Sequence, residues 1–180
     1  PLATAAKKSG VKVYHLNICD PDIETPEVML DVLHNWKDNP IRYGQSQGEL
    51  GFLDAVLSYY HGLGFPFLNT ENVQVTSGGS EAIAMAMFAV ADPGEEILTF
   101  EPLYTNYNSY AAINGIRLNA VSTDISTGFH LPAQEEIEKL ITEKTKAILY
   151  CNPNNPTGTV YTKTEVEMLV AIAKKYKLFL

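Results

Sequence analysis

The second half of the sequence alternates short apolar runs with segments of helical periodicity, and this alternation restricts the fold more than any other feature. Five runs have the length and composition of β-strands: "NVQVT", "EEILTF", "IRLNAV", "KAILYC" and "KLFL". Helical segments begin between them, near Ser80, Tyr104, Pro132 and Lys163. Strands that alternate with helices in this way predict an α/β fold, with a mostly parallel sheet and helices on both of its faces.

Two further helices are predicted nearer the amino terminus. Thr25 and Pro26 supply a hydroxyl cap and a proline at a helix start, and apolar residues recur at helical spacing as far as Trp36. A second apolar stripe runs from Leu53 to Tyr60 and ends at the glycines of "HGLGF". These helices precede the alternating part of the chain and lie outside its β-α pattern.

Charge and apolar content argue against two classes of partner. Thirteen basic and twenty-one acidic residues give a net charge of −8, and no basic cluster is longer than Lys174-Lys175, so no nucleic-acid-binding surface is expected. The longest apolar run, 82–91, is about half of the roughly 20 residues that a membrane-spanning helix needs. Cys19, Cys151 and four isolated histidines fit no metal site, and reduced thiols favour a cytoplasmic protein.

The stretch "VTSGGSEAIAMAMF" contains the first candidate binding residues. Gly78, Gly79 and Ser80 lead into a helix that is apolar on nearly every side, which predicts a buried helix. Glycines allow a ligand to approach the backbone closely, and the first turn of a helix offers unpaired N–H donors with about half a positive charge. These features fit a phosphate, although a tight turn with a serine cap explains the two glycines equally well. The usual dinucleotide and triphosphate loops are absent.

A second candidate, Tyr104, follows the run "EEILTF". Glu101 precedes Pro102, which holds it extended and projects the next residues over the end of the predicted sheet. An aromatic side chain at that position can stack on a flat heterocycle, which contributes about 0.5–1.5 kcal/mol beyond its burial. Tyr107 and Tyr110 follow on the same predicted helix, and we interpret both as packing residues.

The stretch "NPNNPTG", residues 152–158, is the most specific motif. Pro153 and Pro156 fix φ, Gly158 permits a positive φ, and Asn155 is held extended by the proline that follows it. An amide held in this way offers both a donor and an acceptor to the oxygen atoms of a bound ring system. The motif therefore predicts that Asn155 contacts a ligand.

Together these motifs resemble the class I/II aminotransferases, enzymes of fold type I that use pyridoxal 5′-phosphate (PLP). "NPNNPTG" resembles the family's N-P-x-N-P-T-G motif, "VTSGGSEAI" its phosphate loop, "LNICDPDIETPEVM" its substrate-side segment and "YGQSQGELGFLDAVLSYY" its interdomain stretch. The resemblance covers residues 12–180 and implies a PLP-dependent transferase fold that is incomplete in this chain. It implies that residues 1–40 belong to the small domain and residues 41–180 to the large PLP-binding domain.

The resemblance also implies how the coenzyme is held. Gly78, Gly79 and Ser80 would bind its phosphate, and Tyr104 would stack on its pyridine ring. Asn155 would hydrogen-bond the phenolic oxygen of the ring and reach toward the substrate carboxylate. These five residues are the cofactor-binding candidates on this chain's own side of the site.

Two more positions concern the partner subunit and the substrate. Tyr43 would contact the phosphate bound in the other subunit, which implies a homodimer with shared active sites. Cys19 stands where the family usually has glycine, beside the substrate carboxylate, so this contact is expected to differ. The family further implies cis peptide bonds before Pro102 and Pro156.

Three functional residues of the family are not expected within these 180 residues. They are the aspartate that pairs with the pyridine nitrogen, the Schiff-base lysine and the arginine that binds the substrate carboxylate, and each follows the run that corresponds to "KLFL". The opening "PLATAAKKSG" also has the composition of a helix already under way. We therefore expect the sequence to be part of a longer chain and to be inactive alone.

The main expectation is an aminotransferase that moves an amino group between an L-amino acid and a 2-oxo acid by a ping-pong mechanism. Another fold-type I chemistry, such as a carbon–sulfur lyase or an aminocyclopropane carboxylate synthase, stays open because one fold hosts several reactions. From other classes, the alternatives are a PLP-sensing effector domain of a transcription regulator and a non-enzymatic α/β domain that binds another phosphate.

Overall fold

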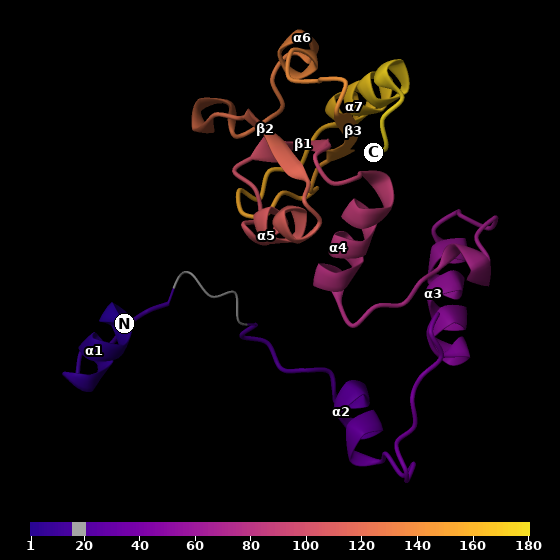
Figure 1. Cartoon of the computed structure of the whole chain (residues 1–180). Coiled ribbons are helices and arrows are strands. Elements are labelled where there is room, and N and C mark those ends of the chain that lie inside the picture. Colours follow the sequence, from indigo (N-terminus) through magenta and orange to yellow (C-terminus); the bar gives the residue numbers. More distant parts are fainter. Residues whose placement is uncertain (16–20) are drawn as a thin grey trace. The chain divides into compact units, whose positions relative to one another are not determined.

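A computed structural model (Figure 1) describes residues 1–15 and 21–180 of the chain. These residues form two compact units, Pro1–Tyr43 and Gly44–Leu180. The larger unit contains the sheet and all but two of the candidate residues. The two exceptions are Tyr43, at the end of the smaller unit, and Cys19, which lies outside the described residues.

The smaller unit contains two helices, α1 (Leu2–Lys8) and α2 (Glu27–His34). Helix α2 begins one residue later than predicted, because Pro26 has φ −53° and ψ 130° and takes the N-cap position instead of the first helical one. No side chain caps this end, so the predicted role of Thr25 is wrong. The apolar face of α2 is exposed in the described chain.

Three parallel strands form the sheet of the larger unit, in the order β2-β1-β3. They are β1 (Glu96–Glu101), β2 (Arg117–Ser122) and β3 (Thr145–Leu149). The predicted strands "EEILTF", "IRLNAV" and "KAILYC" are thus confirmed. Because all three strands run in the same direction, their carboxyl ends lie along one edge of the sheet, where ligands bind in open α/β folds.

Two other predicted strands do not form. The run "NVQVT" instead lies beside a polar turn, where the N–H of Val75 donates to the carbonyl of Gln47 at 2.9 Å. The run "KLFL" makes only an isolated parallel bridge between Phe179 and Ala147 of β3. Both runs have strand-like composition, but a strand also needs a continuous ladder partner, which neither has among the described residues.

Helices cover both faces of the sheet, as predicted (Figure 1). The helices of this unit are α3 (Leu50–Gly62), α4 (Gly79–Val90), α5 (Asn106–Ile113), α6 (Gln134–Glu138) and α7 (Lys163–Tyr176), with 3-10 turns η1 (Thr70–Asn72) and η2 (Ile125–Thr127). Residues of α4 and α5 pack with Ile97 and Ala147 on one face. Residues of α6 and α7 pack with Leu98 and Ile148 on the other. The two faces are therefore two separate apolar cores.

Helix α4 is more exposed than its apolar sequence predicts. Met87 is its only buried residue, whereas Met85 and Phe88 are 48% and 75% exposed. The covered side faces the sheet and α5, where Tyr107 and Ala111 are its neighbours. The remaining apolar sides have no packing partner among the described residues, so the prediction of a buried helix is wrong for this chain.

Helix α7 begins with the predicted capping box. The hydroxyl of Thr162 accepts from the N–H of Glu165, and the Glu165 carboxylate accepts from the N–H of Thr162 at 2.7 Å. The same carboxylate accepts from the N–H of Leu131 at 2.8 Å and lies 3.0 Å from Nδ1 of His130. Burial raises the pKa of Glu165, but these hydrogen bonds outweigh it and lower the pKa to about 2. Glu165 thus joins the start of α7 to the loop after η2.

Replacing this carboxylate should change how stability depends on pH. Because the folded pKa of Glu165 lies below the ordinary value of 4.5, its contribution to stability is present above that value and is lost as pH falls toward 2. In the intact protein, Glu165→Gln should lower the free energy of unfolding at pH 7 by about 1–2 kcal/mol and reduce its decline between about pH 5 and 2. Glu167→Gln, on the exposed side of α7, is the matched control in urea unfolding. The same pH dependence in both variants would contradict this role.

Candidate active site

The candidate residues of the larger unit come from three segments. β1 ends at Glu101 and leads to Tyr104, β3 leads into the turn 152–158, and Ser80 stands in the first turn of α4. The peptide bonds before Pro102 and Pro156 are cis, which confirms that expectation. The bonds before Pro40 and Pro153 are also cis, although nothing in the sequence analysis predicted them.

Two of the three asparagines in the turn 152–158 hold its backbone. Oδ1 of Asn152 accepts from the N–H of Tyr161 at 2.9 Å. Oδ1 of Asn154 accepts from the N–H of Thr157 at 3.3 Å, and the Asn154 carbonyl accepts from the N–H of residue 158 at 2.8 Å. Asn155 is exposed, and its side chain makes no hydrogen bond within the described chain. The amide of Asn155 is therefore available to a ligand.

This division of roles predicts opposite effects on stability. Asn155→Ala should leave the free energy of unfolding of the intact protein within about 0.5 kcal/mol of the original. Asn152→Ala should lower it by about 1 kcal/mol, because the N–H of the buried residue Tyr161 loses its acceptor. Urea unfolding of the two variants side by side measures the difference. An equal loss in both would mean that Asn155 also holds the turn.

The segment from Ser77 to Ser80 forms an open turn at the amino end of α4. The N–H and the hydroxyl of Ser77 both donate to the Glu81 carboxylate, at 2.6 and 2.7 Å, and these hydrogen bonds lower the pKa of Glu81. The backbone N–H groups of Gly78, Gly79 and Ser80 find no acceptor in the described chain. Three donors of the helix start are thus left unused.

Local packing does not explain the two glycines of this turn. Apart from the adjoining residues and the backbone of the helix itself, no protein atom lies within 4 Å of where a Cβ would stand at Gly78 or Gly79. Gly78 has φ 167°, which is extended backbone that any residue adopts. The three N–H groups of this turn have no acceptor in the described chain, and a group with several acceptor oxygens would suit such a cluster of donors. The turn therefore fits the phosphate of a coenzyme.

Tyr104 is half-buried and its ring meets that of Tyr107 edge-on. The ring centroids are 5.5 Å apart and the planes make an angle of 85°. Nδ2 of Asn106 donates to the Tyr104 hydroxyl at 2.7 Å, so the ring is held at both its edge and its hydroxyl. Tyr107 is buried, which agrees with its interpretation as a packing residue. Burial and the neighbouring Cys151 raise the pKa of the Tyr107 hydroxyl to about 12.

The contact that Tyr110 makes was not predicted from the sequence. Its hydroxyl donates to Oγ of Ser80 at 2.6 Å, so it contacts the glycine turn directly and is more than a packing residue. Asn106 and Tyr110 are spaced i, i+4, which predicts that they share a face of α5. The spacing does not indicate which other segment of the chain packs against that face of α5. The bond from Ser77 to Glu81 was also missed.

The two remaining candidates are not brought to this edge by any described contact. Tyr43 ends the smaller unit and its side chain is fully exposed. Cys19 lies outside the described residues. Over residues 1–15 and 21–180, no three His, Cys, Asp or Glu side chains gather closely enough to hold a metal ion. None of the helices described here combines the length and the apolar content needed to cross a membrane.

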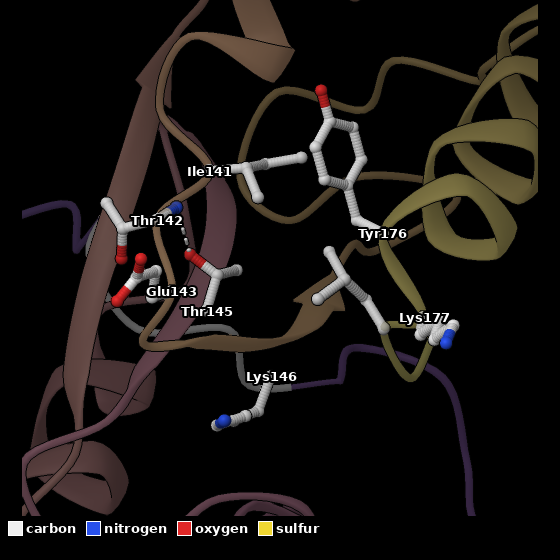
Figure 2. A pocket seen from close by; sticks show the side chains of 8 residues that line it. Ile141, Thr142, Glu143, Thr145, Lys146, Tyr176 and Lys177 are labelled. Atoms are coloured by element: carbon white, nitrogen blue, oxygen red, sulfur yellow. Dashed lines mark hydrogen bonds between the residues drawn. The ribbon is translucent and has the colours of Figure 1, made fainter.

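Figure 2 shows a separate hollow at the amino end of β3. Its volume is about 670 Å³, and its walls come from the turn before β3 and from the end of α7. Within it Thr145 accepts from the N–H of Thr142 at 2.9 Å, and Lys146 pairs with Glu95 at 3.1 Å. Tyr104 and the turn 152–158 follow the carboxyl ends of β1 and β3, so this hollow belongs to the opposite edge of the sheet.

Comparison with known sequences gives a consistent result. The profile of the family described as aminotransferase class I and II matches residues 12–180. The aspartate aminotransferase of Thermotoga maritima is 32% identical over 179 residues, which are 99% of this chain and 47% of that protein. The glutamate-pyruvate aminotransferase AlaA of Haemophilus influenzae is 32% identical over 182 residues, which are 99% of this chain and 45% of that protein.

Solved structures show the same similarity. The crystal structure of aspartate aminotransferase from Thermotoga maritima matches with a TM-score of 0.91 at 32% identity, over 98% of this chain and 47% of that one. Alanine aminotransferase from Pyrococcus furiosus matches with a TM-score of 0.87 at 32% identity, over 98% and 46%. The chain thus spans about half the length of the relatives that it matches.

Proposed function

We propose a function from the premise that the chain belongs to the aminotransferase class I and II family, whose profile covers residues 12–180. The intact protein is a PLP-dependent aminotransferase that moves an amino group between an L-amino acid and a 2-oxo acid. The observation that carries the proposal is the set of unused groups in the larger unit: three open N–H donors at the start of α4 and the unbonded amide of Asn155.

The chain's own residues bind and orient in this proposal. PLP, when bound, supplies an electron sink for the carbanion that forms when the substrate loses its α-proton. Gly78, Gly79 and Ser80 hold the phosphate, Tyr104 stacks on the ring, and Asn155 bonds the phenolic oxygen and faces the substrate carboxylate. None of these groups is a base suited to take the α-proton.

The proton is moved by a Schiff-base lysine that we propose to lie beyond residue 180. The two lysines that flank the turn 152–158 in the sequence are both paired elsewhere. Lys146 pairs with Glu95 at 3.1 Å, and Lys163 pairs with Glu167 at 3.6 Å on the exposed side of α7. Neither ammonium group is directed to the candidate site by these contacts.

The proposal extends to the assembly and its setting. Tyr43 contacts the phosphate in the other subunit of a homodimer, which its full exposure permits. Cys19 lies on the substrate side, residues 1–40 belong to the small domain and residues 41–180 to the large one. The free thiol of Cys151 is compatible with a cytoplasmic protein.

Trapping the coenzyme tests this function directly. The intact protein is incubated with PLP, reduced with borohydride and digested, and the modified peptide is identified by mass. We expect a single pyridoxyl-lysine outside residues 1–180. A protein that gives no specific adduct is not a PLP enzyme, and the residues named above would then have to be explained as structural.

Product analysis separates transamination from the other reactions of fold type I. With an amino acid and a 2-oxo acid together, an aminotransferase forms a new amino acid and a new 2-oxo acid in equal amounts. The named relatives are aminotransferases, which favours this outcome. Pyruvate and ammonia formed without an acceptor would instead identify a lyase.

Asn155 should matter for catalysis without mattering for folding. A hydrogen bond to a charged acceptor or donor contributes about 1.5–3 kcal/mol, so Asn155→Ala should lower kcat/KM by about 10- to 100-fold. Steady-state kinetics of the intact protein, with Asn154→Ala as the control in the same turn, measure this. A larger loss of kcat/KM in the control would shift the role to the shape of the turn.

A further inference from the structure

A series of hydrogen bonds joins Tyr104, the residue proposed to stack on the coenzyme ring, to the glycine turn (Ser77 to Ser80). Nδ2 of Asn106 donates to the hydroxyl of Tyr104 at 2.7 Å and, at the longer distance of 3.4 Å, to the hydroxyl of Tyr110. The Tyr110 hydroxyl donates to Oγ of Ser80 at 2.6 Å. Helix α5 therefore connects the two halves of the candidate site through polar atoms only.

The amide of Asn106 sets the direction of the two bonds that it makes itself. An amide nitrogen donates and cannot accept, so both tyrosine oxygens are acceptors toward Asn106. In the third bond the Tyr110 hydroxyl donates its single proton to Oγ of Ser80. Because Oγ accepts that proton, the proton of Ser80 itself points away from Tyr110 and stays available.

We propose that Tyr110 is a positioning residue of the phosphate site, which acts by holding the Ser80 hydroxyl as a donor toward the coenzyme phosphate. This inference rests on the proposed function. A phosphate dianion accepts hydrogen bonds and has no proton to donate, so a serine hydroxyl helps only when its own proton faces the anion. The bond from Tyr110 removes the competing orientations before the coenzyme arrives.

The Ser80 hydroxyl would bind the phosphate together with the unused backbone N–H donors of the same turn. The N–H groups of Gly78, Gly79 and Ser80 have no acceptor in the described chain. The Ser80 hydroxyl adds a fourth donor at the end of the turn that α5 contacts. Asn106 also holds the Tyr104 hydroxyl, so one amide aligns the ring-binding and the phosphate-binding residues.

The test compares PLP with pyridoxal, which lacks the phosphate. The dissociation constants of both compounds are measured on the intact apoprotein by ultrafiltration. The dissociation constant of pyridoxal divided by that of PLP isolates the contribution of the phosphate to binding. Tyr110→Phe should lower this ratio about fivefold and leave the dissociation constant of pyridoxal unchanged. Tyr176→Phe is the matched control, because its hydroxyl bonds Glu138 at 3.3 Å and belongs to α7. An unchanged ratio in Tyr110→Phe would overturn the inference.

A double-mutant cycle separates this role from simple packing. Ser80→Ala should lower the ratio about tenfold, equal to about 1.4 kcal/mol. Tyr110→Phe should have no further effect in the Ser80→Ala background, because its target is already absent. An equal loss in both backgrounds would show that Tyr110 acts without Ser80 and would refute the proposal. Urea unfolding of each variant confirms that the ratio reports on the folded protein.

The same measurements distinguish this inference from the proposed function. An original protein that binds PLP and gives the pyridoxyl-lysine, with a Tyr110→Phe variant that binds equally well, would overturn only the role of Tyr110. An original protein that binds neither PLP nor pyridoxal would overturn both proposals together.

Discussion

The parallel pairing of β1 with β2 and β3 is the constraint on which the rest of the larger unit depends. Glu96 pairs with Arg117 on one side and with Thr145 on the other, so the three strands start level, while β3 ends at Leu149 opposite Thr99, two residues before β1 ends. Their carboxyl ends therefore release the chain at one edge of the sheet, where Tyr104 and the turn 152–158 follow. An antiparallel β3 would send this turn to the opposite edge.

Two loops of the candidate site each contain some polar groups that are hydrogen-bonded within the loop and others that remain free. In the turn 152–158, Asn152 and Asn154 bind backbone N–H groups while Asn155 does not. In the glycine turn, Ser77 is bonded to Glu81 while the next N–H groups have no acceptor. Each loop thus has a fixed shape before any ligand binds, and this lowers the ordering cost of binding.

The glycine turn also carries a charge that opposes an anion. The Glu81 carboxylate is exposed, and its bonds to Ser77 keep its pKa below its usual range, so it stays ionised near neutral pH. At an exposed position water screens this charge, whereas the backbone donors would touch the phosphate directly.

The sequence by itself determined the α/β class, the strands β1, β2 and β3, the start of α7 and the stiffness of the turn 152–158. All of these follow from local rules of periodicity, capping and proline geometry. Only the tertiary structure decided that "NVQVT" lacks a ladder partner, that α4 is half uncovered and that Tyr110 bonds Ser80. These outcomes depend on which surfaces pack together. Local sequence patterns cannot predict a contact such as that between Ser80 and Tyr110, which are thirty positions apart.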